Sequence, residues 1–232
     1  MKGLRVAFDL DGVLANLEKP YRAAKQALFG ADAPRDGSAA DANAEDESGA
    51  STSNGSRGRG LTHNQESDIW RRIARVSDFW TTLDPLEPGV VRGSQSLATR
   101  YHWDVFFVTQ RPDSAGETTQ RQTQRWLIQQ GFELPTVIVM HGSRGRLADL
   151  LQLDVLVDDT RKHCVDVIAE SKTKPMLVVR SGNTGTTTRA EGLGIHVVGS
   201  VREALITLRQ LSVSPTRTSS MWQRLSRRIG RR

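Results

Sequence analysis

Two aspartates, Asp9 and Asp11, stand one residue apart where the first apolar run of the chain, residues 4–10, ends. Alternate residues of an extended segment share a face, so both carboxylates should lie on one side, about 7 Å apart. Open parallel sheets bind their ligands at the carboxyl ends of their strands. The pair therefore predicts two acids that point into a binding crevice. A solvated turn at Gly12 is the alternative.

A polar group also follows a second apolar run. Thr109 closes the segment 105–108, and Gln110 and Arg111 come directly after it. A hydroxyl with adjacent loop amides can hold phosphate oxygens, and an arginine two residues further on can clamp an anion through two hydrogen bonds. We therefore predict an oxyanion site at this strand end, with an ordinary polar strand terminus as the alternative.

Two consecutive acids, Asp158 and Asp159, close a third apolar run at 155–157. Neighbouring carboxylates at the mouth of a buried strand repel each other, and a hard divalent cation relieves that repulsion. The pair predicts a share in a metal site. The sequence leaves open which acid is the direct ligand, and we favour Asp158.

The elements that must position these residues alternate along the chain. Short apolar runs predict strands at 4–10, 103–108, 136–140, 155–157, 176–179 and 195–198, and amphipathic spacing predicts helices at 17–29, 64–76, 120–130 and 201–211. This alternation is typical of an α/β fold, a Rossmann-like doubly wound parallel sheet with helices on both faces. We expect the segment 181–188, which contains Gly182 and Gly185, to be a loop.

Three predicted strands that end in D-x-D, Thr and D-D, in this order, resemble the haloacid dehalogenase (HAD) superfamily of phosphatases over residues 4–211. The resemblance implies that Asp9 is a nucleophile forming an aspartyl-phosphate. It assigns Asp11 as proton donor to the leaving group and then as base for the hydrolytic water. It also implies Mg²⁺, held by Asp9, the backbone carbonyl of Asp11, and Asp158 or Asp159. The acid at position 11 favours phosphotransfer over dehalogenation.

One position departs from the family pattern. The third motif of the family is usually a lysine, and Arg144 stands where that lysine is expected. Arginine keeps the charge, but its guanidinium is a larger, planar donor. Arg146 is an alternative candidate for the role of that lysine. A further alternative is that the arginine at this motif is an ordinary surface residue. We expect Arg144 to bind the phosphate.

The long connection after the first strand predicts a helical cap at 16–88, with the core formed by 1–15 and 89–212. Residues 31–60 contain no large hydrophobic side chain, so we expect a disordered insertion there. The segment 79–89 resembles the corresponding stretch of the 5′(3′)-deoxyribonucleotidases. That resemblance implies that Phe79 and Trp80 stack on a nucleobase; the alternative is that both are buried cap hydrophobes. The loop after Thr109 and the insertion do not follow that subfamily.

The charge of the chain is concentrated at its end. The net charge is +6, and the tail 213–232 contains six arginines and no acid, so the remainder sums to zero. The basic character therefore says little about what the globular part binds. Met221, Trp222, Leu225 and Ile229 recur at helical spacing, which predicts either a basic helix that contacts nucleic acid or an anionic membrane surface, or a solubilising tail.

Composition excludes other classes of protein. The single cysteine, Cys164, excludes an intramolecular disulfide and a multi-cysteine metal site, and we interpret it as a small buried hydrophobic residue. The five histidines show no pair at metal-binding spacing, so none is chosen as a ligand. No apolar stretch reaches about 18 residues and no hydrophobic leader follows Met1, so we expect a cytoplasmic protein.

The sequence thus predicts a Mg²⁺-dependent phosphomonoesterase that acts through an aspartyl-phosphate. Its expected substrate is a nucleoside monophosphate or a similar small phosphorylated metabolite. Two alternatives stay open. The substitution of arginine for lysine leaves room for a catalytically impaired phosphate-binding or scaffolding protein, and the basic tail would suit a phosphatase that acts on nucleic-acid ends.

Overall fold

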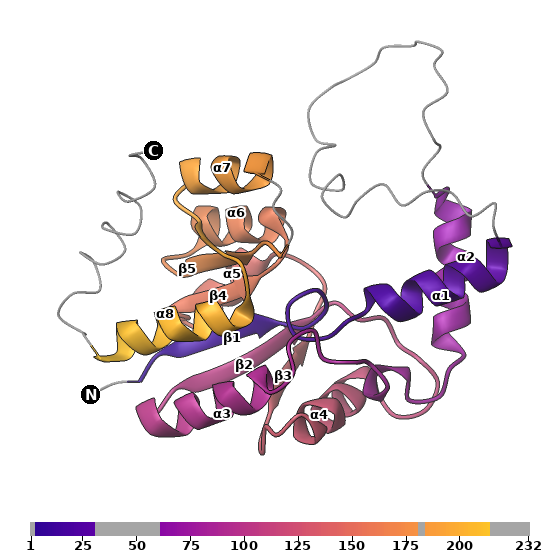
Figure 1. Ribbon diagram of the computed structural model, residues 1–232, viewed down its shortest axis with the longest axis horizontal. Coiled ribbons are helices and arrows are strands. Elements are labelled where there is room, and N and C mark those ends of the chain that lie inside the picture. The colour runs from indigo at the N-terminus through magenta and orange to yellow at the C-terminus, as the bar shows by residue number, and fades with distance from the viewer. Residues whose placement is uncertain (1–2, 31–60, 181–183, 214–232) are drawn as a thin grey trace, which may run out of the picture.

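The computed structural model describes residues 3–30, 61–180 and 184–213. The expected insertion at 31–60 and the tail from residue 214 onward lie outside the described residues. Six parallel strands form one sheet in the order β3-β2-β1-β4-β5-β6 (Figure 1). The strands are β1 (Arg5–Asp9), β2 (Asp104–Thr109), β3 (Thr136–Val139), β4 (Val155–Asp158), β5 (Lys174–Val178) and β6 (His196–Val198). The predicted α/β sheet is confirmed.

Nine helical segments accompany the sheet in the described part of the chain. They are α1 (Glu18–Phe29), α2 (His63–Ala74), the short 3₁₀ helix η2 (Phe79–Thr81), α3 (Val90–Tyr101), α4 (Thr119–Gln129), α5 (Arg144–Leu150), α6 (Arg161–Glu170), α7 (Thr184–Gly192) and α8 (Val201–Val213). The expectation of a loop at 181–188 is wrong from Thr184 onward, where α7 begins. Ala190 of this helix is fully buried against Leu177 and Ile195, and such packing outweighs the weak helix propensity of its threonines.

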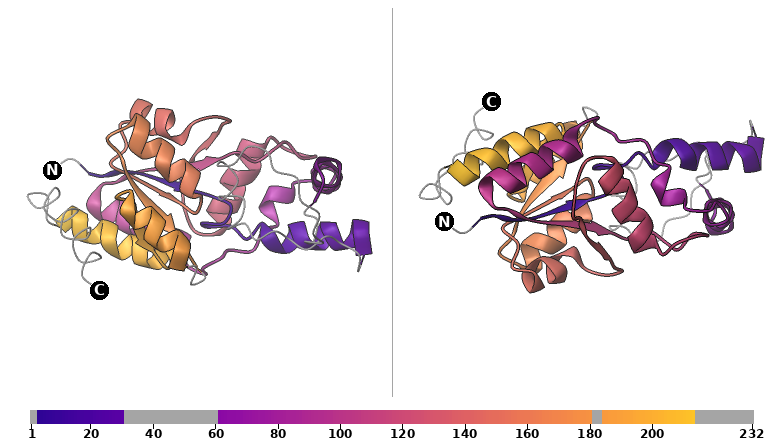
Figure 2. Two further views of the ribbon diagram at one scale, coloured as in Figure 1. Left: turned by 90° about the horizontal axis from the view of Figure 1, so that it is seen from above. Right: turned by 90° about the horizontal axis from the view of Figure 1, so that it is seen from below.

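Side-chain alternation along β1 divides the core into two layers. Val6 and Phe8 belong to the cluster that buries residues of α3, α4 and α8, whereas Ala7 belongs to the cluster formed with α5 and α6. Figure 2 shows α3 and α8 together on one face of the sheet and α5 and α6 on the other. Because both faces are covered, the central strands consist almost entirely of apolar residues up to their last position.

The register of the central strands decides which side chains meet. β1 lies between β2 and β4, with Asp9 paired to Val108 and Phe8 paired to Val157. Since all strands are parallel, the last residues of these three strands lie at one edge of the sheet. That edge therefore carries Asp9, Thr109 and Asp158. Asp9 and Asp158 are more than a hundred residues apart in the chain.

The helices α1 and α2 pack against each other and project beyond this edge (Figure 1). The helix α2 begins with a capping box, in which Thr62 and Gln65 exchange side-chain to backbone hydrogen bonds. By contrast η2, within the predicted cap range, packs against α4 beside the sheet. The boundaries of the predicted cap and core stay a prediction.

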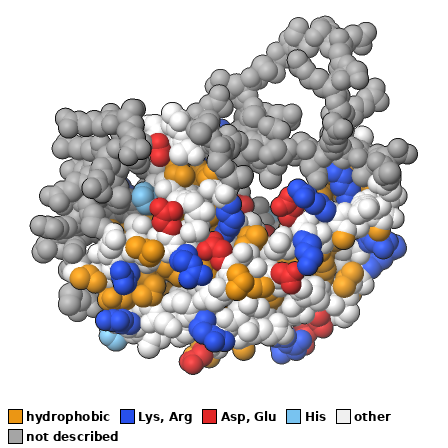
Figure 3. Space-filling view, in the orientation of Figure 1, with side chains coloured by type: hydrophobic (Ala, Val, Ile, Leu, Met, Phe, Trp, Pro, Cys, Tyr) orange, Lys and Arg blue, Asp and Glu red, His pale blue; other side chains and the backbone are white. Residues whose placement is uncertain are grey.

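The described surface mixes both signs of charge. Figure 3 shows acidic and basic side chains interspersed on the face in view, with no field of a single sign among the described residues. This agrees with the zero net charge of the chain before the tail. Among residues 3–30, 61–180 and 184–213, no helix combines the length and the hydropathy needed to cross a bilayer.

Candidate active site

A pocket of about 230 Å³ lies at the carboxyl ends of β1, β2 and β4. It brings together most of the residues that the sequence selected, and it is lined by Asp9, Asp11, Leu17, Trp70, Trp80, Thr109, Gln110, Arg111, Pro112, Arg144, Asp159, Thr160 and His163. A larger hollow of about 490 Å³ lies where β2 and β3 begin, beside α3, and contains none of the predicted site residues. The chemistry of the chain is therefore concentrated in the smaller pocket.

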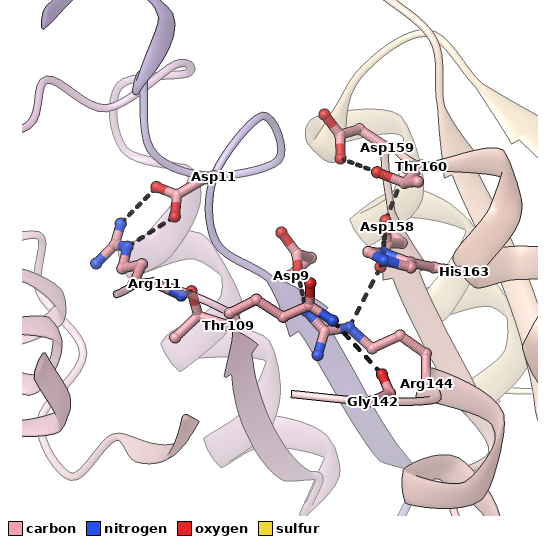
Figure 4. A network of polar contacts seen from close by, with 11 residues as sticks. Asp9, Asp11, Thr109, Arg111, Gly142, Arg144, Asp158, Asp159, Thr160 and His163 are labelled. Carbon is pink, nitrogen blue, oxygen red and sulfur yellow. Dashed lines mark hydrogen bonds and ion pairs between the residues drawn. The ribbon is translucent and has the colours of Figure 1, made fainter. Parts of the chain in front are cut away.

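Asp9 forms an ion pair with Arg144 inside this pocket (Figure 4). Nη2 of Arg144 donates to Oδ1 of Asp9 over 2.8 Å, and only 9% of Asp9 and 1% of Arg144 are exposed. Burial and the nearby Asp158 carboxylate raise the pKa of Asp9 well above its ordinary value, although Arg144 acts in the opposite direction. The pocket thus holds more buried negative charge than Arg144 compensates.

Two nitrogens of the Arg144 guanidinium lack hydrogen-bond acceptors among the described residues. These are Nε and Nη1, which are both buried; Nε lies 3.8 Å from Oδ2 of Asp158. Buried polar groups are normally hydrogen-bonded, so orphaned donors at a binding edge point to an absent acceptor. A tetrahedral oxyanion beside Asp9 would provide such acceptors.

The start of α5 places Arg144 rather than Arg146 at the site. Ser143 caps the helix, with Oγ accepting from the backbone N–H of Gly145 at 3.0 Å and of Arg146 at 3.3 Å. A Cβ on Gly145 would lie 2.1 Å from the carbonyl oxygen of Asp166, so only glycine lets α5 approach α6 this closely. The Arg146 side chain is 85% exposed and pairs with Glu170.

Asp11 is bound on both of its oxygens by Arg111. Nε of Arg111 donates to Oδ2 and Nη2 donates to Oδ1, each over 2.8 Å, and Nη1 donates to Thr123 over 3.0 Å. The Arg111 side chain is fully buried. Each nitrogen of the guanidinium thus already donates to a protein oxygen, and the anion that Arg111 clamps in this structure is Asp11. Arg111 also lines the pocket, and its contact with a substrate phosphate stays a prediction.

The two residues before Arg111 differ in exposure. Thr109 is 1% exposed, lines the pocket, and accepts a hydrogen bond from the backbone N–H of Arg111 at 3.2 Å. Gln110 is exposed, and its amide nitrogen lies 3.4 Å from the carbonyl oxygen of Gly142. Both remain within reach of an anion in the pocket, Thr109 from the strand end and Gln110 from the rim.

Asp158, the last residue of β4, and its neighbour Asp159 point in different directions. Asp158 is fully buried, accepts from the backbone N–H of Thr160 at 2.8 Å, and lies 3.0 Å from Nδ1 of His163. Asp159 lines the pocket, and its Oδ2 lies so close to Gly12 that a Cβ there would approach to 1.8 Å. Burial and Asp158 raise the pKa of Asp159 to about 6. Asp159 is thus the acid of this pair that faces the pocket.

Phe79 and Trp80 are both buried, and Trp80 also lines the pocket. Phe79 is 5% exposed and Trp80 is fully buried. The guanidinium of Arg111 covers the Trp80 ring at 4.7 Å, and the indole N–H of Trp80 donates to Pro112 over 3.0 Å. Their place in the hydrophobic core agrees with the alternative of buried hydrophobes, and stacking on a nucleobase stays a prediction.

Sequence reasoning missed several residues around the pocket. His163 was set aside as an isolated histidine, but the first turn of α6 returns it to Asp158. Leu17 and Trp70 reach the pocket from the segments of α1 and α2, and no sequence signal marked them. Arg180 follows β5 and donates to the backbone carbonyls of Gly12 and Val13. The signal that identified the other site residues, a polar side chain just after an apolar strand, would also have identified Arg180 after β5.

The acids of the described region form no group of three or more His, Cys, Asp or Glu side chains with the geometry of a metal site. Three acidic residues line the pocket, namely Asp9, Asp11 and Asp159. Carboxylate and carbonyl oxygens are the ligands that Mg²⁺ prefers. Burial, and after it the neighbouring Asp158 carboxylate, raises the pKa values of Asp9 and Asp159. These residues fit a hard cation.

Comparison of the sequence with protein-family models gave no match, and neither did comparison with curated proteins. Solved structures share the fold. A hydrolase from Pseudomonas syringae superposes with a TM-score of 0.55 at 15% identity, over 90% of this chain and 99% of that one. A HAD family hydrolase from Deinococcus radiodurans R1, with bound phosphate and sodium, gives 0.51 at 14% identity, over 91% and 95%. The chain therefore has the fold of the HAD family hydrolases.

Proposed function

We propose that this protein is a Mg²⁺-dependent phosphatase of the HAD type, which cleaves phosphate monoesters through an aspartyl-phosphate on Asp9. The observation that carries the proposal is the buried Asp9–Arg144 pair, in which a carboxylate lies beside orphaned guanidinium donors. Such a pair offers a nucleophile and an oxyanion site at the same point. The HAD fold and the phosphate bound by one structural neighbour support it.

The reaction follows from the positions of the two acids. A carboxylate oxygen of Asp9 attacks phosphorus, and the bond from phosphorus to the leaving oxygen breaks while protonated Asp11 gives its proton to that oxygen. Water then attacks the phosphorus of the aspartyl-phosphate and gives a proton to Asp11. Free phosphate leaves, and the carboxylate of Asp9 and the acid form of Asp11 are restored.

Arg144, Thr109 and Gln110 are proposed to bind the phosphate oxygens, with Arg144 supplying the donors that are now unpaired. Asp9, Asp159 and the backbone carbonyl of Asp11 are proposed to hold Mg²⁺. We choose Asp159 over Asp158 because Asp158 is already occupied by His163 and Thr160. When bound, Mg²⁺ supplies neutralisation of the negative charge that phosphate and carboxylate bring together.

The substrate is proposed to be a small phosphorylated metabolite. The pocket volume of about 230 Å³ is below the roughly 300–1,000 Å³ typical of sites for drug-sized ligands. The cap resemblance implies a nucleoside monophosphate, but Phe79 and Trp80 are buried and offer little ring surface to a base. A compact leaving group in contact with Leu17 and Trp70 suits the pocket better.

The experiment that tests this proposal is phosphate release from a panel of phosphorylated metabolites by the full-length chain and by Asp9→Asn. An amide cannot attack phosphorus, so the variant should lose all turnover while keeping its far-ultraviolet circular dichroism spectrum. A covalent phosphoenzyme trapped on the wild-type protein and absent from the variant would identify the nucleophile directly. Turnover near the wild-type rate in Asp9→Asn would remove Asp9 from the mechanism.

A further inference from the structure

The guanidinium of Arg111 faces the carboxylate of Asp11 (Figure 4). Two of its nitrogens bind the two oxygens of Asp11 and the third binds Thr123. Its side chain is fully buried, although Asp11 opposite keeps 19% of its own side chain exposed. Arg111 lines the pocket together with Asp11, but its hydrogen bonds are directed at Asp11 and Thr123.

The contacts behind Arg111 fix its orientation. The plane of Trp80 lies under the guanidinium at 4.7 Å, and Trp80 is itself held by Pro112 through its indole N–H and by Gln122 through its backbone N–H at 3.1 Å. Gln122 is fully buried on α4. Asp11 is thus connected through Arg111 to a rigid part of the core that carries no other part of the proposed chemistry.

This support matters because Asp11 stands in a turn. The strand β1 ends at Asp9, and Gly12 adopts a left-handed conformation with φ 82°. A side chain at such a place has several rotamers available unless a partner selects one. A guanidinium fork binds a carboxylate in one plane through two parallel hydrogen bonds, which removes that freedom. Each carboxylate oxygen keeps a second acceptor position, so the group can still carry a proton toward the pocket.

We propose that Arg111 is the positioning residue of Asp11, which holds this carboxyl group in the orientation from which it transfers its proton to the leaving-group oxygen. The inference rests on the proposed function, because it assumes that Asp11 is the general acid. The hydrogen bonds of the Arg111 guanidinium go to Asp11 and Thr123, so we assign its role to Asp11 and not to the substrate. Its role is therefore distinct from that of Arg144, which donates to Asp9 and is proposed to bind the phosphate.

The test compares two substrates of nearly the same shape, phenyl phosphate and p-nitrophenyl phosphate. The p-nitrophenolate ion leaves readily without a proton, whereas phenolate benefits strongly from one. The quantity to measure is kcat/KM, because it reports the steps up to the departure of the leaving group and excludes later hydrolysis. A residue that positions the acid should affect phenyl phosphate far more, and a residue that only supports the fold should affect both substrates equally.

We expect Arg111→Gln to lower kcat/KM for phenyl phosphate by about 100-fold, the size of effect that misplacing a reacting group by about 1 Å can cause. The loss should be about tenfold smaller for p-nitrophenyl phosphate, since general acid catalysis contributes little there. Asp11→Asn should show the same dependence on the leaving group. Arg111→Lys, which keeps the charge without the fork, should fall between the wild type and Arg111→Gln for phenyl phosphate.

Arg125→Gln is the matched control, because it makes the same substitution at a half-exposed arginine of α4 that pairs with Glu117. It should leave both substrates unchanged. If Arg111→Gln does not fold, Arg111→Lys is used for the test. The quantity compared is then its loss in kcat/KM for phenyl phosphate relative to its loss for p-nitrophenyl phosphate. Equal losses for both esters, or no loss, would overturn the positioning role of Arg111. If the loss in Asp11→Asn does not depend on the leaving group, the proposed role of Asp11 is overturned instead. If the wild type hydrolyses neither ester, the proposed function itself is overturned.

Discussion

Arg180 and Glu87 form an ion pair of 3.1 Å between the end of β5 and the segment that leads into α3. Arg180 also donates to the carbonyl oxygen of Val13 over 2.6 Å, in the turn that carries Asp11. Glu87 accepts from the backbone N–H groups of Val201 at 2.8 Å and Arg202 at 3.1 Å, at the start of α8. The pair thus ties the turn after β1, the connection before α3 and the last helix to one another.

The first prediction concerns the pH dependence of this tie. Burial by itself raises the pKa of Glu87, but the two backbone N–H groups and Arg180 outweigh it, so the pKa lies below the ordinary value of 4.5. A carboxyl group with a lowered pKa stabilises the fold above its unfolded pKa and loses that effect as pH falls through its folded pKa. Glu87→Gln should therefore cost about 1 kcal/mol at pH 7, a shift in Tm of about 2–4 °C.

Urea unfolding of the wild type and of Glu87→Gln between pH 7 and pH 3.5 measures this difference. The gap should narrow as pH falls from 4.5, the ordinary pKa that applies to the unfolded chain, through the lower pKa of Glu87 in the folded protein. Glu133→Gln, at an exposed position, serves as the control and should show no gap at any pH. A gap that stays constant with pH would mean that Glu87 acts through packing and not through its charge.

The second prediction separates the two arginines of α5. Arg144→Met should lower kcat/KM about 10²–10³-fold, since it removes the donors proposed to face the phosphate. Arg146→Met makes the same change two positions later in the same turn, at a side chain that is 85% exposed, and should leave activity unchanged. Steady-state kinetics of both variants, with circular dichroism to establish folding, measures the contrast. Equal effects of the two substitutions would contradict the assignment of Arg144.

The third prediction concerns the metal. Removal of divalent cations with a chelator should abolish turnover, and added Mg²⁺ should restore it. Because a ligand that binds only the folded state stabilises it, Mg²⁺ at about 100 times its Kd should add about 2.7 kcal/mol to the free energy of unfolding. Asp159→Asn should lose most of this stabilisation in a thermal melt, whether or not a substrate is known. Full activity in excess chelator would remove Mg²⁺ from the proposal.

The fourth prediction concerns the basic tail, which we propose as a contact for nucleic acid or an anionic membrane surface. A chain ending at Val213 loses six arginines and the whole net charge of +6. Turnover of a small ester should stay within about twofold, because charges beyond a Debye length are screened from the pocket. Binding of the full chain to single-stranded DNA or to phosphatidylserine vesicles should weaken steeply with salt and should disappear on truncation. Absence of binding at low salt would leave the tail a solubilising role.

The sequence by itself determined the sheet and the residues at its active edge. The apolar runs that end at Asp9, Thr109 and Asp158 could be recognised because parallel strands buried on both faces are apolar along their length. The first polar residue after each run therefore marks a strand end, and parallel strands bring those ends to one edge. The charge balance likewise separated the tail from the rest of the chain without any coordinates.

The tertiary structure alone decided how those residues pair. Arg111 and Asp11 are 100 positions apart, and Arg144 and Asp9 are 135 apart, so no local pattern relates them. The sequence identified Arg111 as an anion clamp but could not show that the anion is a neighbouring carboxylate. It placed Phe79 and Trp80 near the site but could not tell a stacking platform from a core, because burial depends on what packs above a ring. Residue type predicts the chemistry a side chain can perform, and only the packing of distant segments selects its partner.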